Sequence, residues 1–264
     1  MNRREFLSRT SVLAMGVTLL SVAWAQIQGL NEAINKSGRQ RMLSQRMAKS
    51  YLQLGLGTDV EHSRKILATS VTLFEQQLSE LLVFAPSAEN RSVFEKMESV
   101  WITYKEILLS SAPNPQAARE VMLISEKILA LAQTATLQLE KHSGSPSAKL
   151  VNVAGRQRML SQRMAKYYQA LQWGVAPPDS LEKLEAARKE FIAGMEFLLS
   201  STSNTPTIKA GLALAQQQWL FFDMALRQSG DEREKKQFAT NVATTSERIL
   251  EVMDGLTALY QKIA

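Results

Sequence analysis

Two arginines inside a repeated block of sequence are the residues of this chain best suited to chemistry. The block GRQRMLSQRMAK occurs at residues 38–49 and again, unchanged, at 155–166. On a helical wheel, Arg41 lies in the middle of a face of mostly small residues, and Arg158 has the same place in the second copy. A guanidinium donates parallel hydrogen bonds to planar oxyanions. The block therefore indicates a place where a small anion could bind.

Packing of the two blocks against each other would bring the two arginines together. Small residues let helices approach closely, and two like faces in one chain favour packing about a pseudo-two-fold axis. Two guanidiniums in a closed helix contact repel each other and lose solvation, and an anion between them removes that penalty. We therefore expect a small-anion site made by Arg41 and Arg158, with Gly38 and Gly155, one turn earlier, making room for the ligand.

The alternative interpretation needs no ligand. An arginine on a helix is commonly solvated or paired with an acid, and a stripe of small residues is commonly just packing. The block itself has no acid, and Glu32 lies beyond the i,i+4 reach of Arg41. Lys49 and Lys166 are expected at the surface. The other arginines of the block are expected to pair with acids on neighbouring helices or to face solvent; they are Arg39, Arg46, Arg156 and Arg163.

The repeat extends beyond the block and predicts an all-α fold. SEKIL at 125–129 parallels SERIL at 246–250, so each unit has about 115–120 residues. Each unit contains four amphipathic stretches separated by glycine and proline. Predicted helix starts include Asn114 before a proline, and capping boxes at Asp179 and at Asp231 with Glu234. We predict two tandem up-down four-helix bundles, at residues 26–143 and 144–264.

The first 25 residues have the composition of an export signal rather than of a folded segment. Arg3 and Arg4 precede Phe6 and an apolar run at 12–25, which is too short to span a membrane comfortably. The run ends in Ala-Trp-Ala, a pattern that signal peptidase accepts. The start resembles a twin-arginine signal, which exports folded proteins. We therefore predict a periplasmic protein with a cleaved leader at 1–25 and no stable membrane insertion after cleavage. The alternative is that the segment stays uncleaved as an N-terminal anchor.

The composition of the 264 residues argues against an enzyme. The absence of cysteine excludes disulfides, thiolate metal sites and cysteine nucleophiles. His62 and His142 are the two histidines, and neither forms a Glu-x-x-His pair. Ser44 and Ser161 have no nearby base and are expected to pack. We expect no catalytic activity, no cofactor and no metal. The charge of +6 includes the leader and is too small to predict nucleic-acid binding.

The larger apolar side chains are expected in the core. The eleven methionines are better suited to filling space between helices than to binding copper. Trp101, Tyr104 and Trp219 have a spacing that favours core packing over a ligand pocket.

The repeated block resembles a known sensory domain. INKSGRQRM at 34–42 and VNVAGRQRM at 151–159 are similar to the N-terminal sensor domain of type IV pilus methyl-accepting chemotaxis transducers (PilJ-type). They also resemble the P-box of periplasmic nitrate/nitrite sensor kinases (NarX-type). With the SEKIL and SERIL match, the resemblance extends over nearly all of residues 27–264.

The resemblance implies a fold and a ligand. In the nitrate sensors, a helical bundle dimerises through its first helix, and the motif arginine of each subunit holds the anion on the dyad. That arginine aligns with Arg41 and Arg158, and the motif glycine aligns with Gly38 and Gly155. One chain would then supply both halves. Arg39-Gln40 replaces the small and apolar residues of the nitrate sensors and is closer to the pilus-transducer version.

Two functions follow as hypotheses. The first is an exported binding protein for a small oxyanion, nitrate or nitrite favoured, that reports to a membrane sensor, transducer or transporter. The transmembrane and cytoplasmic signalling segments of those sensors have no counterpart in this sequence, so a membrane partner is expected. The second is a ligand-free helical interaction module that docks on a chemoreceptor or a pilus-related partner.

Overall fold

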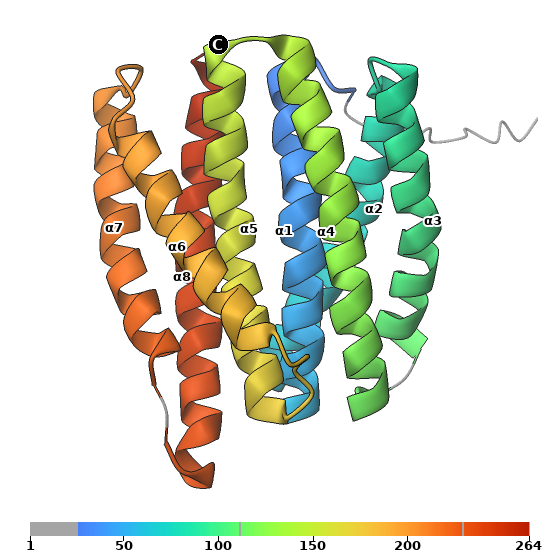
Figure 1. Cartoon of the computed structure of the whole chain (residues 1–264), viewed down its shortest axis with the longest axis vertical. Helices are drawn as coiled ribbons and strands as arrows, with labels where there is room; N and C mark the ends of the chain where they lie inside the picture. The colour runs from blue at the N-terminus through green and yellow to red at the C-terminus, as the bar shows by residue number, and fades with distance from the viewer. Residues whose placement is uncertain (1–25, 111, 229, 264) are drawn as a thin grey trace, which may run out of the picture.

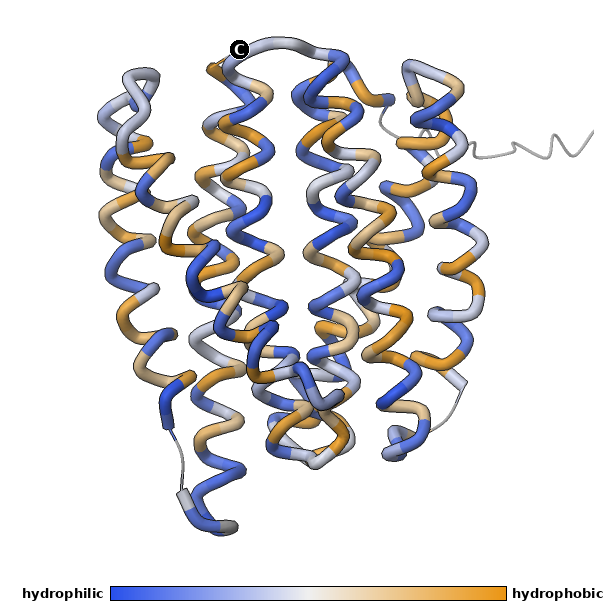
Figure 2. Tube along the Cα trace, viewed as in Figure 1, coloured by the Kyte–Doolittle hydropathy of each residue, from blue (hydrophilic) through white to orange (hydrophobic). Residues whose placement is uncertain are grey.

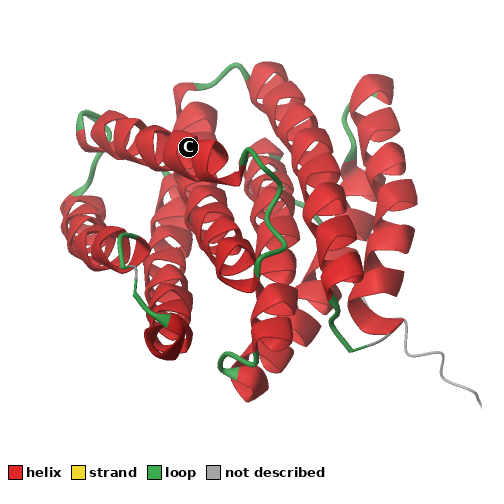
Figure 3. Cartoon of the chain, turned by 60° about the horizontal axis from the view of Figure 1, so that its bottom comes forward, coloured by secondary structure: helices red, strands yellow, loops and turns green. Residues whose placement is uncertain are grey.

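The described part of the chain is helical, with short loops between the helices. The computed structural model describes residues 26–110, 112–228 and 230–263, which form eight α-helices and no strand (Figure 1, Figure 3). The first repeat forms α1 (Leu30–Leu56), α2 (Val60–Phe84), α3 (Ala88–Ser110) and α4 (Pro115–Ser143). The second forms α5 (Pro146–Trp173), α6 (Ser180–Leu199), α7 (Pro206–Leu226) and α8 (Glu232–Lys262). The all-α prediction with four helices per repeat is confirmed. The predicted leader lies outside the described residues.

Most predicted helix starts are present, with one exception. The side chain of Asn114 accepts a hydrogen bond from the first turn of α4 at 3.0 Å, and Asp231 forms the capping box of α8 with Glu234. The capping box predicted at Asp179 is wrong. Its backbone (φ −87°, ψ 9°) is not extended as a cap requires, and its carboxylate holds the Lys183 ammonium at 2.7 Å instead.

The two repeats meet through their first helices. α1 packs against α2 and α4 of its own repeat, and α5 packs against α6 and α8. α1 and α5 also lie against each other in the middle of the molecule (Figure 1). The helix pairs α2/α3 and α6/α7 form the two outer sides, with α3 and α7 at opposite edges (Figure 1). The helices that carry the repeated blocks are therefore the innermost ones.

One apolar core runs through both repeats. Trp101 stacks on Phe74 with ring centroids 4.3 Å apart, and Trp219 stacks on Phe191 at 4.4 Å. Tyr104 meets the edge of Trp101 at 6.0 Å. These matching contacts confirm the predicted core placement of the three residues and extend the repeat into the outer helices. Figure 2 shows apolar and polar segments alternating along the helices, as expected for helices with one buried side.

Polar side chains are buried mainly in α1 and α5. No helix within the described residues has the apolar length that a membrane span requires. The two innermost helices instead bury four charged side chains completely; these are Arg41, Lys49, Arg158 and Lys166. Burying a charge is costly unless it is paired or hydrogen-bonded, so these four positions mark where the sequence departs from simple core packing.

Candidate functional site

Each motif arginine reaches across to the other repeat. Nη2 of Arg41 on α1 donates to the side-chain and backbone oxygens of Asn152 on α5, at 2.8 and 3.3 Å. Nη2 of Arg158 on α5 donates in the same way to Asn35 on α1, at 2.7 and 3.2 Å. The two motif helices thus meet within one chain, in the pseudo-two-fold arrangement that the repeated block predicts.

The two guanidiniums lie beside the motif glycines. A Cβ atom at Gly38 would lie 2.9 Å from Nη2 of Arg41 and 3.9 Å from Nη2 of Arg158. A Cβ atom at Gly155 would lie 3.1 Å from Nη2 of Arg158 and 3.7 Å from Nη2 of Arg41. A side-chain carbon at either position would crowd the guanidiniums. The structure therefore brings the four predicted site residues together, and the glycines leave the space that the arginines fill.

Burial and neighbouring cations lower the pKa of both arginines. Burial is the main cause for Arg41, and the charges of Arg156 and Arg158 add to it and bring its pKa to about 9. Burial and the charge of Arg39 lower the pKa of Arg158 to about 10, against the opposing charge of Asp254. Both stay charged at neutral pH. Within the described chain, the Nε atom of each has no hydrogen-bond partner.

The two repeats differ at one position that determines the charge next to the arginine pair. Gln133 on α4 accepts a hydrogen bond from Nη1 of Arg41 at 2.6 Å. The equivalent residue on α8, 121 positions later, is Asp254. Its carboxylate accepts from Nη1 of Arg158 and also from Arg39 at 2.7 Å. Arg158 therefore contacts a counter-charge, whereas Arg41 has neutral hydrogen-bond partners among the described residues.

Amide side chains close the space around the pair. Asn152 also donates to Glu140 of α4, and Asn35 donates to Gln261 of α8 at 2.6 Å. Neither motif arginine is exposed, and neither lines the groove between α1, α2 and α8. In this conformation an anion would reach the pair after these amide contacts had opened.

A second crossed contact joins the repeats two turns further along α1. Glu247 of α8 accepts hydrogen bonds from Arg46 and Lys49 of α1. The Lys49 ammonium also donates to the hydroxyl of Ser246 at 3.0 Å. Ser246 and Glu247 are the first two residues of the SERIL segment. The block of the first repeat therefore contacts the SERIL segment of the second repeat.

The same contact is present on the other side of the pseudo-two-fold axis. Glu126 of α4 accepts hydrogen bonds from Arg163 and Lys166 of α5, both at 2.6 Å. The prediction that Lys49 and Lys166 lie at the surface is wrong, because both side chains have 0% exposure. Helices from both repeats surround the two helices that carry the block. The last residue of each block is therefore buried, and its ammonium pairs with a carboxylate of the other repeat.

The remaining arginines of the two blocks form ion pairs with acids. These pairs join Arg39 to Asp254, Arg46 to Glu247, Arg156 to Glu190 and Arg163 to Glu126. The expectation that these arginines pair with acids on neighbouring helices is confirmed.

The charges of the crossed contacts are stable at neutral pH. Burial alone would raise the pKa of Glu126, but the charges of Lys166 and Arg163 outweigh it and hold that pKa at about 2. The basic partners of Glu247 do the same and hold its pKa at about 2. Burial lowers the pKa of Lys166 to about 8, against the charge of Glu126. Neutral pH lies between these values, so both partners are ionised.

The Ser-Glu segments also tie each motif helix to its own repeat. Nε2 of Gln45 donates to the backbone oxygen of Ser125 at 3.0 Å, and Nε2 of Gln162 donates to that of Ser246 at 2.9 Å. The serine carbonyl thus binds the glutamine of its own repeat, while the adjacent glutamate binds the lysine and arginine of the other. Each motif helix is therefore hydrogen-bonded to its own repeat and to the other repeat at about the same height along its axis.

The other polar residues considered in the sequence have structural surroundings. Ser44 and Ser161 are buried, and each donates at 2.8 Å to the carbonyl of the arginine three residues before it, which agrees with a packing role. His62 and His142 are exposed. Among the described residues, no group of histidines and acids has a metal-binding arrangement.

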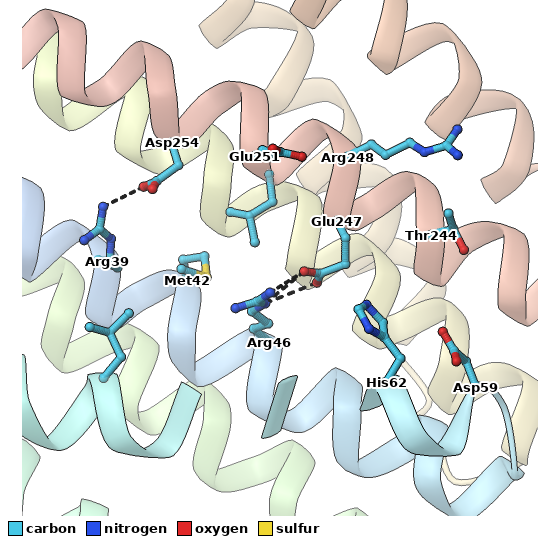
Figure 4. Close-up of a pocket in the computed structure, with 12 residues that line it drawn as sticks. Arg39, Met42, Arg46, Asp59, His62, Thr244, Glu247, Arg248, Glu251 and Asp254 are labelled. Carbon is cyan, nitrogen blue, oxygen red and sulfur yellow. Dashed lines mark hydrogen bonds and ion pairs between the residues drawn. The ribbon is translucent and has the colours of Figure 1, made fainter. Parts of the chain in front are cut away.

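A groove of about 800 Å³ lies between α1, α2 and α8, outside the ion pairs (Figure 4). Figure 4 shows Arg39 and Arg46 of α1 bonded across it to Asp254 and Glu247 of α8. Because Asp254 also bonds the buried Arg158, its carboxylate connects the groove with the arginine pair. The groove walls also include His62, Asp59, Thr244, Arg248 and Glu251.

Several site residues were not predicted from the sequence. Asn35 and Asn152 each stand three residues before the motif glycine, and this recurrence could have identified them. Gln133 and Asp254 differ between the repeats, so a search for identical residues does not find them. Their role depends on which helix faces the block, which the tertiary structure decides.

The fold and the site define a helical sensory-type module in which one chain supplies both halves of a two-fold arginine pair. The family PilJ, described as the type IV pili methyl-accepting chemotaxis transducer N-terminal domain, matches residues 22–124 and again 142–245. The two matches cover most of the chain, and the chain belongs to this family. Comparison with curated proteins and with solved structures gives no match. The predicted duplicated PilJ-type domain is confirmed, and the relation to the nitrate-sensor P-box stays a prediction.

Proposed function

We propose that this chain is a sensory helical module of the cell envelope that acts by docking on a chemoreceptor or a pilus-related partner. The family match over both repeats is the observation that carries this proposal. The closed motif site supports it, because partners within the chain already hold the arginine pair. The family is a sensory one, which agrees with the expectation of a protein without catalytic activity.

A periplasmic location is part of the proposal. It rests on the twin-arginine-like sequence of residues 1–25, with the mature repeats at 26–143 and 144–264. A route that exports folded proteins suits this chain, because each repeat provides buried counter-charges for the other. The repeats would therefore be assembled before they reach the partner.

The groove between α1, α2 and α8 is where we propose that the partner binds. The exposed side chains of Asp59, His62, Arg248 and Glu251 line it, and none of them forms a hydrogen bond or ion pair within the described chain. A partner that pairs with these groups would also contact Asp254. The hydrogen bonds from Arg39 and Arg158 to the Asp254 carboxylate would then change, so docking would affect the buried arginine pair.

Site-specific photocrosslinking tests this proposal. A photoreactive residue in place of Arg248, in the groove, is expected to give an adduct with a chemoreceptor or pilus component in envelope extract. The matched control replaces Lys127, the exposed equivalent of Arg248 on α4. The adduct should form with and without nitrate. Recovery of the protein without an adduct from position 248 contradicts docking at this groove.

A second candidate function is binding of a small oxyanion, nitrate or nitrite favoured, at Arg41, Arg158, Gly38 and Gly155. It is supported by the position of Arg41, whose hydrogen-bond partners in the described chain are neutral, beside a second buried guanidinium, each with an unpartnered Nε. A planar anion could take the place of the Asn35 and Asn152 amide oxygens, because both accept from the Nη2 atoms that such an anion would need.

Thermal unfolding in nitrate, nitrite and phosphate, against chloride at equal ionic strength, tests the second candidate. A ligand at 100 times its Kd stabilises by about 2.7 kcal/mol. The shift should disappear in Arg41→Ala and in Arg158→Ala, and persist in Arg64→Ala, an exposed arginine. Equal melting temperatures in all four anions would exclude this function and leave the docking module.

A further inference from the structure

α7 is apolar on two opposite faces. Its inner face packs on the core through Ile208, Leu212, Ala215 and Phe222. Its outer face, as defined here, consists of Ala210, Ala213, Leu214, Leu220, Phe221 and Met224, with Gln217 at its centre. Leu220, Phe221 and Met224 are 63%, 58% and 67% exposed. No charged residue lies between Lys209 and Asp223.

The first repeat provides an internal control for this face. α3 is the equivalent of α7, and the stacked Trp101 and Trp219 fix the alignment at 118 positions. The matching positions on α3 are Ser92, Glu95, Lys96, Ser99, Ile102, Thr103 and Glu106. This outer face is polar except for one isoleucine. The apolar outer face of α7 is therefore not a requirement of the fold, which tolerates a solvated face at the same place.

We propose that the outer face of α7 binds the same face of a second copy of this chain, with the two α7 helices antiparallel. The face has two alanines and Leu214 before Gln217, and three large side chains after it. An antiparallel pair centred on Gln217 places Met224 over Ala210 and Phe221 over Ala213 of the second copy. Leu220 then meets Leu214. At the Met224 and Phe221 levels a large side chain opposes an alanine, and at the Leu220 level two leucines meet, so the face is complementary in shape to itself at its two ends.

The polar residues agree with the same arrangement. Gln217 falls on the two-fold axis, where two amides can bond each other and fix the register. Lys209 and Asp223 lie on one flank of the face, at opposite ends. In the antiparallel pair the lysine of each copy approaches the aspartate of the other, whose carboxylate also pairs with Arg188 and Arg227 of its own copy. A parallel pair would instead place the large side chains of the two copies at the same level and keep the two flanks with Lys209 and Asp223 apart.

The number and size of these faces limit the assembly. α7 offers such a face and its counterpart on α3 does not, so the pairing closes as a two-fold dimer and does not extend into a fibre. The contact consists of one helix face from each copy, so a reversible dimer is expected. α7 lies at an outer edge of the molecule, away from the groove in Figure 4, so dimerisation is independent of the proposed docking site (Figure 1).

Sedimentation equilibrium of the whole protein over a concentration series tests the dimer. Phe221→Glu is expected to raise the dimer dissociation constant at least about tenfold. The matched control is Thr103→Glu, the same change at the equivalent position of α3, which should leave the equilibrium unchanged. A protein that is monomeric at every concentration overturns the proposal. The proposal is also overturned if the protein is a monomer that binds lipid vesicles through Phe221, because the outer face of α7 would then be a membrane-binding surface.

Cysteine crosslinking tests the antiparallel geometry, because the natural chain has no cysteine. Oxidised Gln217→Cys should form a covalent dimer, and Ser99→Cys on α3 should not. Ala210→Cys mixed with Met224→Cys should crosslink more than either variant alone. Crosslinking of each variant with itself, but not with the other, would indicate parallel helices and overturn the proposed arrangement.

Discussion

Lys49 and Glu247 form an ion pair that joins the two repeats, because the ammonium comes from α1 and the carboxylate from α8. The lysine side chain is 0% exposed and the glutamate 18%. Lys166 and Glu126 make the same contact in the opposite direction. Separating the repeats would break both ion pairs and expose the contact between α1 and α5 to water. We infer that the repeats fold and unfold as one unit.

Glu247→Gln should lower the free energy of unfolding by about 3 kcal/mol, because it leaves Lys49 buried without a counter-charge. Urea unfolding followed by circular dichroism measures the change. Glu251→Gln is the control, since this exposed glutamate on the same helix has no ion-pair partner in the described chain, and it should stay within about 0.5 kcal/mol. Equal effects of the two substitutions would show that the crossed pair does not stabilise the fold.

Stability should fall in acid. Glu126 and Glu247 have a pKa of about 2 in the folded chain, against an ordinary value of 4.5. A carboxyl group with a lowered pKa contributes stability that is present above its unfolded pKa and is lost as pH falls through the folded one. The loss is therefore expected between pH 4.5 and pH 2. Unfolding free energies across that range should decrease less steeply in the Glu126→Gln, Glu247→Gln double variant than in the natural chain.

Gly38→Ala should destabilise the protein by about 1–3 kcal/mol, because the new Cβ would displace the Arg41 guanidinium from its hydrogen bonds. Gly255→Ala is the control, since a Cβ at this exposed position of α8 meets nothing within 4 Å. Removing that helical glycine should stabilise by about 0.5–1 kcal/mol. Thermal and urea unfolding of both variants should shift in opposite directions, and a shift in the same direction would exclude the crowding argument.

Asp254→Asn should destabilise by about 1–2 kcal/mol, because it removes the carboxylate that contacts both Arg158 and Arg39, while solvent reaches the 44% exposed aspartate and screens part of the effect. The reverse change in the first repeat, Gln133→Asp, should stabilise by giving Arg41 a counter-charge. Nitrate or phosphate should rescue Asp254→Asn more than chloride does. Melting temperatures of the two variants, recorded in each anion, check this, and identical responses to all three anions would mean that the pair does not attract anions.

The repeated block predicted much of this molecule. Identical residues at 38–49 and 155–166 predicted two equivalent helices, and their small-residue faces predicted that Arg41 and Arg158 come together. Four amphipathic helices per repeat followed from glycine, proline and apolar spacing. These features are local or repeated, so a single sequence displays them directly.

The sequence by itself therefore determined the helices, the duplication and the meeting of the two arginines. Only the tertiary structure decided which charges neutralise which. Lys49 looked exposed because a wheel of one helix does not show that neighbours from both repeats surround it. Asp254 gave no signal because it stands where the first repeat has Gln133. The ion pairs of Lys49 with Glu247 and of Arg158 with Asp254 join residues 198 and 96 positions apart, and such proximity has no period in the sequence.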